Sequence, residues 1–277
     1  MESGTVSVPM SLDLSADYKV TSLNTKVLSG GPRNGAFDEH GIFPLSPVRV
    51  GDEIWAYPTG WSRRQSVDVE TQVGLAISSN NGKTFDLVGA GSVLGPSLHE
   101  PFLVGDACVV RLSPSEWHAW FIYGIEWRRG VSSPRAERIY KIGHAASSDG
   151  VHWSREPRKG GSRCVPDAIG PDECQAMPSV IRLGNTFHML FCYREAFAFR
   201  TDPQRSYRIG HAYSNDLVTW RRSDMPRETW LDGSWNSQMQ CYPNVFMHGD
   251  RVLVAHNGNS FGQSGFGLSE VRFDNDC

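Results

Sequence analysis

The sequence predicts an all-β protein, a β-propeller made of four-stranded antiparallel units, and three observations lead to this prediction. The 277 residues include 9 Trp, 13 Phe and 8 Tyr beside 28 Gly and 16 Pro, which suits many short strands joined by tight turns. A turn motif recurs at a nearly constant spacing. A hairpin pattern precedes each copy of this motif, so each repeat holds about four strands.

The turn motif consists of Ser-x-Asp or Ser-x-Asn, followed four residues later by an aromatic residue. It occurs at residues 79–85, 147–153 and 214–220, so that successive copies begin 68 and 67 residues apart. Asp and Asn side chains bond to their own backbone in turns, and Gly adopts positive φ there, so each copy predicts a hairpin turn.

Upstream of each motif, two strand-like stretches with alternating apolar residues predict a second hairpin. These stretches lie near residues 48–57, 109–121 and 180–191, and a fourth begins at residue 245. The predicted repeat units therefore span about 40–95, 100–158, 171–224 and 235–273. Because such units bury their faces against their neighbours, we expect one propeller domain over residues 1–277.

The last unit ends early and lacks an outer strand. Residues 1–30 contain two strand-like stretches, 6–14 and 18–28. We expect these N-terminal closing strands to complete the last unit and so close the ring. Four blades closed in this way, or five blades with a reduced first blade, both fit the pattern.

The charge and the termini restrict the partners and the compartment. A formal net charge of −3 argues against nucleic acid or an anionic membrane as partner. The first residues lack the basic and apolar regions of a signal peptide, and no apolar run has the length of a membrane span, so we expect a cytoplasmic protein. The six cysteines are scattered without Cys-x-x-Cys pairs, which predicts neither a zinc site nor a disulfide framework.

Acidic residues stand just before the inner strands, where a propeller brings residues together at its central channel. Asp38 precedes the first hairpin, and Glu173 precedes the third. Glu100 and Asp106 both precede the second. Glycoside hydrolysis requires such a group, with one carboxylate as base or nucleophile and another as acid. The alternative interpretation is that each acid caps a turn, as Asp often does.

Five motifs give the chain a resemblance to a known group of enzymes. They lie at residues 35–42, 73–78, 142–153, 207–214 and 257–267, and the matching region runs from about residue 34 to the end. In these motifs the sequence resembles the five-bladed β-propeller glycoside hydrolases of the arabinanase, xylosidase and invertase type, families 43, 32 and 68, and especially a bacterial branch of them. The resemblance favours five blades over four.

The resemblance also implies roles for the acidic residues. It implies Asp38 as the base or nucleophile, Asp106 or Glu100 as a modulating carboxylate, and Glu173 as the general acid. The run from Asp172 to Cys174 resembles the Glu-Cys acid motif of the invertase-type members.

The sequence departs from this group at several positions. The first blade keeps only its outer part, Asn236 and Gln238 stand where the branch often has acids, and Ala107 follows Asp106 where the wider superfamily often has Pro. These departures favour an alternative function, a non-catalytic carbohydrate-binding or scaffold propeller.

Sugar binding requires flat apolar faces with polar groups at their edges. The candidates at hairpin ends are Trp61, Trp127, Tyr193 and Trp235 as aromatic surfaces, with Arg194 and Asn257 as hydrogen-bonding partners. The alternative interpretation is that the aromatic residues pack the blades.

The nine histidines suggest a third function, a metal-dependent enzyme. His144 and His211 occupy equivalent positions in successive units, while His40 and His99 lie in the acidic turns. If the channel held a metal, a structural calcium or a transition metal, these four would be its ligands together with carboxylates. A histidine repeated at one strand position is more often a feature of the repeat, so we expect no cofactor.

The sequence thus predicts a glycosidase that hydrolyses a glycosidic bond in a sugar or glycoconjugate. The sugar, the linkage and the oligomeric state are not predicted.

Overall fold

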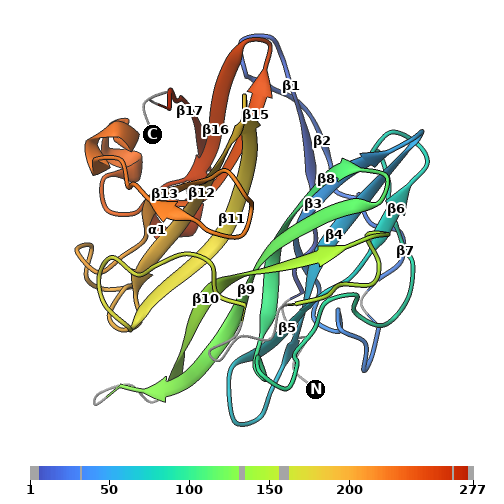
Figure 1. Ribbon diagram of the computed structural model, residues 1–277, viewed down its shortest axis with the longest axis horizontal. Coiled ribbons are helices and arrows are strands. Elements are labelled where there is room, and N and C mark those ends of the chain that lie inside the picture. The colour runs from blue at the N-terminus through green and yellow to red at the C-terminus, as the bar shows by residue number, and fades with distance from the viewer. Residues whose placement is uncertain (1–5, 32, 131–134, 156–161, 264, 274–277) are drawn as a thin grey trace. The chain divides into compact units, whose positions relative to one another are not determined.

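The computed structural model describes residues 6–31, 33–130, 135–155, 162–263 and 265–273. Nearly all regular structure in these ranges is β-strand (Figure 1). The only helical elements described are α1 (Asn259–Gly262) and the 3-10 turns η1 (Arg227–Trp230) and η2 (Ser234–Asn236). Within the described residues, no helix has the length and apolar character needed to cross a membrane.

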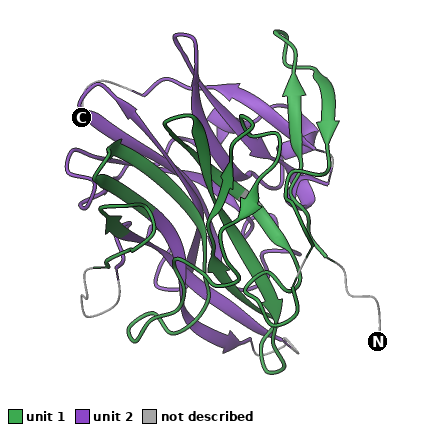
Figure 2. Ribbon diagram, turned by 90° about the vertical axis from the view of Figure 1, so that its right-hand side faces the viewer, with its two compact units in different colours: residues 1–119, 145–156 green, residues 120–144, 157–277 purple. Residues whose placement is uncertain are grey.

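The chain divides into two compact units, coloured separately in Figure 2. Unit 1 comprises residues 1–119 and 145–156, and unit 2 comprises residues 120–144 and 157–277. The boundaries fall inside the strands β9 (Glu116–Arg129) and β10 (Ala136–Ser147). That all 277 residues form one propeller domain stays a prediction.

Each predicted repeat unit contains one antiparallel sheet. The first sheet has the order β3-β4-β6-β7, with β5 also paired to β4: β3 (Ile42–Val50), β4 (Glu53–Arg63), β5 (Val69–Val73), β6 (Ala76–Ser78) and β7 (Asp86–Leu87). The second is β10-β9-β8, which begins with β8 (Val104–Ser113).

The remaining two sheets belong to unit 2. The third has the order β11-β12-β13-β14: β11 (Glu173–Leu183), β12 (Thr186–Glu195), β13 (Arg208–Ser214) and β14 (Arg221–Arg222). The fourth is β15-β16-β17: β15 (Cys241–His248), β16 (Arg251–Asn257) and β17 (Phe266–Glu270). Between them, Leu190, Ile209, Trp230, Val245, Val254 and Val271 form one buried apolar cluster.

The second and third copies of the turn motif form side-chain-supported turns as the sequence predicts, whereas in the first copy Ser78 and Asn80, one residue earlier than predicted, accept these bonds. Ser147 Oγ accepts a hydrogen bond from Gly150 N–H at 2.9 Å, and Asp149 Oδ1 accepts from Val151 N–H and His152 N–H, both at 2.8 Å. A hydrogen bond with the His152 side chain, followed by these backbone bonds, lowers the pKa of Asp149. The same acceptor pattern recurs around Asp216, so the repeat in the sequence is a repeat of turn chemistry.

The N-terminal segment differs from our expectation. Its strands β1 (Ser11–Leu14) and β2 (Val20–Asn24) pair with each other. Parallel bridges join Ser7 to Gly41 and Leu28 to Phe85, and both Gly41 and Phe85 lie in the first repeat unit. The described part of the segment thus pairs with the first repeat, not with the last as predicted; residues 1–5 lie outside the described ranges. Burial provides the reason, because Val27 is 2% exposed in an apolar cluster with Phe85.

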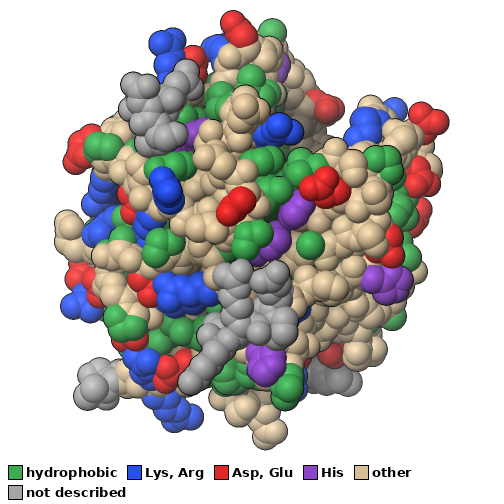
Figure 3. Space-filling model, viewed as in Figure 1, with side chains coloured by type: hydrophobic (Ala, Val, Ile, Leu, Met, Phe, Trp, Pro, Cys, Tyr) green, Lys and Arg blue, Asp and Glu red, His purple; other side chains and the backbone are tan. Residues whose placement is uncertain are grey.

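Charged side chains of both signs are interspersed over the face seen in Figure 3. This distribution agrees with the small net charge of −3. A surface of this kind gives a polyanion little long-range attraction.

Candidate active site

Asp38 lies in a run of turns that leads into β3. Its carbonyl oxygen accepts a hydrogen bond from Gly41 N–H at 2.9 Å, and the next residue but one, His40, donates its N–H to Trp61 O on β4 at 3.0 Å. Gly41 has φ of 110°, and an added Cβ would lie 2.0 Å from Ser7 O, so only glycine fits there. The turn is therefore held between the N-terminal segment and β4.

Close packing of Phe37 fixes the residue before Asp38. The Phe37 ring is buried against two glycines: a Cβ on Gly60 would lie 2.4 Å from it, and a Cβ on Gly74 would lie 2.2 Å from it. Both distances are far below van der Waals contact. Any larger residue at either glycine would displace Phe37 and the Asp38 backbone with it.

The carboxylate of Asp38 is buried without a full set of partners. The residue is 1% exposed, and its Oδ1 accepts no hydrogen bond from the described residues. Arg33 Nη2 lies 3.5 Å from that oxygen, an ion pair without hydrogen-bond geometry. Arg33 Nε and His40 Nδ1 are likewise buried without a hydrogen-bond partner. Buried polar atoms nearly always have partners, so three such atoms within eight residues mark a candidate ligand site.

Trp61 forms an aromatic surface beside this turn. Its ring stacks on Phe43, with centroids 6.3 Å apart and an interplanar angle of 15°, and lies 5.2 Å from the His40 ring. Its Nε1 donates to Ser7 Oγ at 2.6 Å, and Phe43 is 39% exposed. Arg63 also lies over the Trp61 ring, 5.9 Å from its centroid. The structure thus brings together Asp38, His40 and Trp61 from our predicted residues, beside the partly exposed Phe43 ring.

In unit 2, the carboxylate of Glu173 is buried and fully bonded. Oε1 accepts from Arg222 Nη1 at 2.6 Å and from Gln175 Nε2 at 2.9 Å, and Oε2 accepts from Ala168 N–H at 2.8 Å and Ile169 N–H at 3.0 Å. All four groups are donors. They match a carboxylate, which is an acceptor on both oxygens, whereas a protonated carboxyl group would also have to donate.

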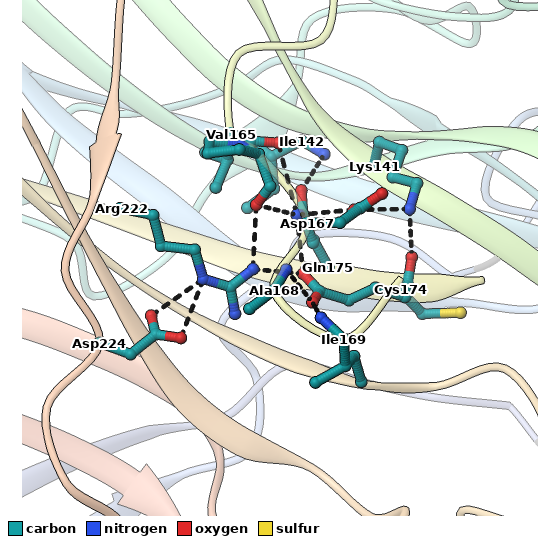
Figure 4. A network of polar contacts seen from close by, with 12 residues as sticks. Lys141, Ile142, Val165, Asp167, Ala168, Ile169, Cys174, Gln175, Arg222 and Asp224 are labelled. Carbon is teal, nitrogen blue, oxygen red and sulfur yellow. Dashed lines mark hydrogen bonds and ion pairs between the residues drawn. The ribbon is translucent and has the colours of Figure 1, made fainter. Parts of the chain in front are cut away.

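The bonds to Glu173 belong to a network of charged side chains, of which Figure 4 labels Lys141, Asp167, Arg222 and Asp224. Arg222 Nε also donates to Asp224, to one oxygen at 3.0 Å and to the other at 2.9 Å. Lys141 Nζ, which is buried, donates to Asp167 Oδ1 at 2.7 Å and to Glu173 O at 2.6 Å. Burial opposes the charge of Arg222, but Glu173 and Asp224 outweigh it and raise its pKa. The loop that supplies the two backbone donors is thereby fixed to β10 and β14.

The neighbouring Asp172 has a different environment. Its carboxylate pairs with Arg128 Nη1 at 2.7 and 2.8 Å, and its side chain is 45% exposed, against 0% for Glu173. Of the two acids in this turn, Glu173 is therefore the one in a buried, organised environment.

Glu100 and Asp106, both in unit 1, differ from Asp38. Glu100 is 2% exposed and its Oε2 accepts from Arg155 Nη1 at 2.5 Å. Burial lowers the pKa of Arg155, and Glu100 opposes this effect. Asp106 is half-buried, and its backbone N–H donates to Thr59 Oγ1 at 2.8 Å. The role of either acid as a modulator stays a prediction.

The first strands of three repeats, β8, β11 and β15, share a backbone feature that allows their positions to be compared. Asp106, Met177 and Tyr242 all have positive φ, of 50°, 51° and 57°, early in β8, β11 and β15. Strand pairing slips at the same point of β11 and β15, and also of β3, next to Phe43. These are β-bulges, which redirect the chain at the end of a strand.

Measured from the bulge, the predicted acids are not equivalent. Asp38 lies five residues before Phe43, Glu100 six before Asp106, and Glu173 four before Met177. The repeat therefore brings acids to the same end of each sheet without placing them at the same position. Asp38, the buried acid with an oxygen that accepts no hydrogen bond from the described residues, belongs to unit 1, and Glu173, which accepts four, belongs to unit 2.

Arg194 is enclosed by aromatic rings. Its guanidinium lies 3.5 Å from the Phe199 ring centroid, 5.2 Å from Tyr140 and 5.5 Å from Tyr207, and the residue is 2% exposed. Its Nη1 donates to the carbonyl oxygen of Glu195 at 2.8 Å. These contacts stabilise the interior of unit 2. A contact of Arg194 with substrate stays a prediction.

The other predicted sugar-binding residues are spread over unit 2. Tyr193 lies under Arg222, 4.3 Å from ring centroid to guanidinium carbon, and burial raises its pKa. Trp235 stacks on His256 at 5.3 Å, and Asn257 Nδ2 donates to Phe261 O at 3.1 Å. Trp127 on β9 is half-buried.

The four histidines considered as metal ligands have separate environments. His211 Nδ1 donates to Ser223 O at 2.9 Å, and its Nε2 lies 3.1 Å from His188 Nδ1. His144 packs on Trp120, at 5.6 Å between ring centroids, and His99 is exposed. Within the described ranges, no three His, Cys, Asp or Glu side chains are grouped as ligands for a metal ion.

Sequence reasoning missed Arg33 and Arg222, the cations beside Asp38 and Glu173. Arg33 precedes the first sheet, and Arg222 ends the two-residue strand β14. Arg222 lies two residues after the Trp of the third turn motif, and Arg155, which bonds Glu100, lies two residues after the Trp of the second, so comparison of these repeats could have revealed Arg222. Arg33 lies outside the repeated motifs, and its only signal was its charge, because a buried carboxylate needs a cation or several donors.

Comparison of the sequence with known proteins identifies two relatives. No protein-family model matches the chain. Two uncharacterised proteins of Mycobacterium tuberculosis, MT1551 and Rv1502, are each 29% identical to it over 265 residues, which cover 94% of this chain and 81% of the relative.

Solved structures that resemble the chain include glycoside hydrolases. A thermostable family-43 glycoside hydrolase has a TM-score of 0.65 at 13% identity, covering 92% of this chain and 80% of that one. An endo-arabinase from Bacteroides thetaiotaomicron has a TM-score of 0.52 at 12% identity, and the match covers 93% of this chain and 83% of that one. A family-32 β-fructofuranosidase from Bombyx mori has a TM-score of 0.56 at 16% identity, and the match covers 82% of this chain and 45% of that one. The chain therefore has the β-propeller fold of these enzymes, which confirms the predicted fold class; the count of five blades stays a prediction.

Proposed function

We propose that the protein hydrolyses a glycosidic bond, with Asp38 as the base or nucleophile. The observation that carries this proposal is the state of the Asp38 carboxylate, which is 1% exposed and has an oxygen that accepts no hydrogen bond. Leaving such a group unsatisfied costs free energy, about 1–3 kcal/mol or more for a charged group. A cost of this kind is typical of sites whose partner is a substrate.

The surroundings of Asp38 suit a carbohydrate. The Trp61 and Phe43 rings offer a flat apolar face, and His40 Nδ1 offers a polar atom without a partner. Sugar rings combine an apolar face with hydroxyl groups at the edge, so such a site can bind both parts.

We assign Glu173 as the second carboxylate, the general acid. Its burial and its position at the start of β11 support the assignment. To donate a proton, Glu173 must first lose one of its four donors and become protonated. Arg222 is the charged donor among the four and favours the ionised carboxylate most strongly, so its displacement would allow protonation.

A specific observation favours the second candidate function, a propeller that binds carbohydrate without cleaving it. Glu173 accepts hydrogen bonds from four donors and so matches a permanent anion. In that case Asp38 would bind sugar hydroxyls, and Glu173 would hold the loop before β11.

Turnover measurements with matched variants distinguish the two functions. Arabinan, fructan and mannan oligosaccharides are incubated with the protein, and the release of reducing sugar is followed. For a glycosidase, Asp38→Asn should lower kcat at least about 100-fold, and Glu173→Gln should remove turnover while binding is retained. Asp52→Asn, an exposed change in the same unit, is the control and should match the unmodified protein. Binding without sugar release by the unmodified protein supports the second function.

A further inference from the structure

Arg33 and Asp38 present a donor and an acceptor that face one another without forming a hydrogen bond. Arg33 Nη2 lies 3.5 Å from Asp38 Oδ1, and its donation is to Gly89 O, at 2.8 Å. Arg33 Nε and Asp38 Oδ1 are both buried, and neither has a hydrogen-bond partner among the residues that the structure describes. The side chain of Arg33 is 39% exposed, whereas that of Asp38 is 2% exposed. Arg33 therefore forms the outer, accessible part of this pair.

The two groups together define the chemistry of what fits between them. Nε and Nη2 lie on one edge of the planar guanidinium, so this edge offers a second N–H beside the one nearest Asp38. A group placed there must accept a hydrogen bond from Arg33 and donate one to Asp38. A hydroxyl does both, whereas a carboxylate of the ligand would be repelled by Asp38 and an ammonium group would be repelled by Arg33.

We propose that Arg33 is a substrate-binding residue that, together with Asp38, binds one hydroxyl group of a neutral sugar. This inference rests on the proposed function and deepens it, because it names the part of the substrate that the site recognises. Bound in this way, the hydroxyl satisfies both buried atoms. A sugar that lacks the hydroxyl leaves them unpaired, so Arg33 also determines specificity.

The position of Trp61 agrees with this arrangement. Its ring lies 5.2 Å from His40, two residues along the chain from Asp38, and it faces Phe43. A ring stacked on this surface has its edge hydroxyls directed toward polar groups of the same turn. Apolar stacking then supplies affinity that does not depend on Arg33, which makes the contribution of Arg33 separable by experiment.

Binding measurements with the full-length protein test the proposal. Arabinose, xylose, fructose, mannose and glucose are titrated individually, and binding is followed by saturation-transfer NMR and calorimetry. For the tightest ligand, each monodeoxy analogue is then titrated against the unmodified protein and Arg33→Met. Arg33→Lys, which keeps the charge and loses Nε–H, separates hydrogen bonding from charge. Arg49→Met is the control, since Arg49 is an exposed arginine of the same unit that donates to Asn81.

The proposal predicts that Arg33→Met and Arg33→Lys both weaken binding about tenfold or more, while Arg49→Met does not. For one deoxy analogue alone, the reduction in affinity caused by removing the hydroxyl and the reduction caused by Arg33→Met should not add, because both changes remove the same contact. Equal binding by Arg33→Met and Arg49→Met overturns the inference and leaves the proposed function standing. Additive losses for every deoxy analogue overturn it as well. Failure of all five sugars to bind the unmodified protein overturns the proposed function itself, and the inference with it.

Discussion

Removal of the cation beside Glu173 should destabilise unit 2 by a large amount. In Arg222→Met the buried carboxylate loses the one charged group among its four described donors, at 2.6 Å, and the guanidinium contact with the Tyr193 ring is lost as well. Breaking a buried ion pair from one side typically costs about 3–5 kcal/mol, because an uncompensated charge stays in the interior. Glu173 keeps three other donors, so we expect the lower end, about 3 kcal/mol.

Urea unfolding followed by tryptophan fluorescence measures this loss, and calorimetry should show the melting temperature falling by about 5–10 °C. Combining the change with Glu173→Gln removes the buried charge, so the double variant should regain about half of the lost stability. Arg205→Met is the control. Arg205 pairs with Glu195 at 3.0 Å, but both side chains are more than 40% exposed, and its loss should cost less than about 1 kcal/mol. If Arg222→Met costs no more than Arg205→Met, Glu173 is not a buried anion and the reasoning is refuted.

Three further predictions concern packing, pH and aromatic binding. Gly74→Ala should cost about 1–3 kcal/mol in urea unfolding and weaken sugar binding, because its Cβ meets Phe37 beside Asp38; unchanged binding would contradict this. Burial and the neighbouring His211 lower the pKa of His188 to about 4, from an ordinary value of 6.5, so stability should fall as pH decreases from 6.5 toward 4. His188→Phe, which cannot be protonated, should reduce the loss between pH 7 and 4.5 by about 2 kcal/mol, and an equal loss in both proteins would count against the shift. Trp61→Ala should weaken sugar binding at least about tenfold with folding retained, and an effect confined to stability would mean that Trp61 only packs against Phe43.

The fold could be predicted because it depends on local repetition. Ser147 and Asp149 form the same turn as Ser214 and Asp216, and that chemistry is visible in the sequence as a constant spacing. Strand pairing follows from alternating apolar residues on either side of such turns. The pairing of the N-terminal segment was predicted wrongly because both candidate edges are β-strands, and only the burial of Val27 decides between them.

The candidate site could be predicted only in part. The acids were visible because Asp38 and Glu173 stand before strands of a repeat. Their different states depend on the groups that surround them: Glu173 is bonded by Arg222, 49 positions later, whereas Asp38 lies 3.5 Å from Arg33, which stands in the same turn region, without a hydrogen bond. A sequence pattern shows which groups occur near a strand end, but not which of them receive partners. That distinction depends on loops, whose positions follow from packing.

The proposed function depends on binding of the reacting sugar at the Asp38 turn of unit 1. A crystal structure of Asp38→Asn with an oligosaccharide that the unmodified protein cleaves would show where this sugar lies. We expect a sugar ring over Trp61, with one hydroxyl between Arg33 and residue 38. A sugar bound elsewhere, with the Arg33 and Trp61 side chains still in contact only with protein, would contradict it.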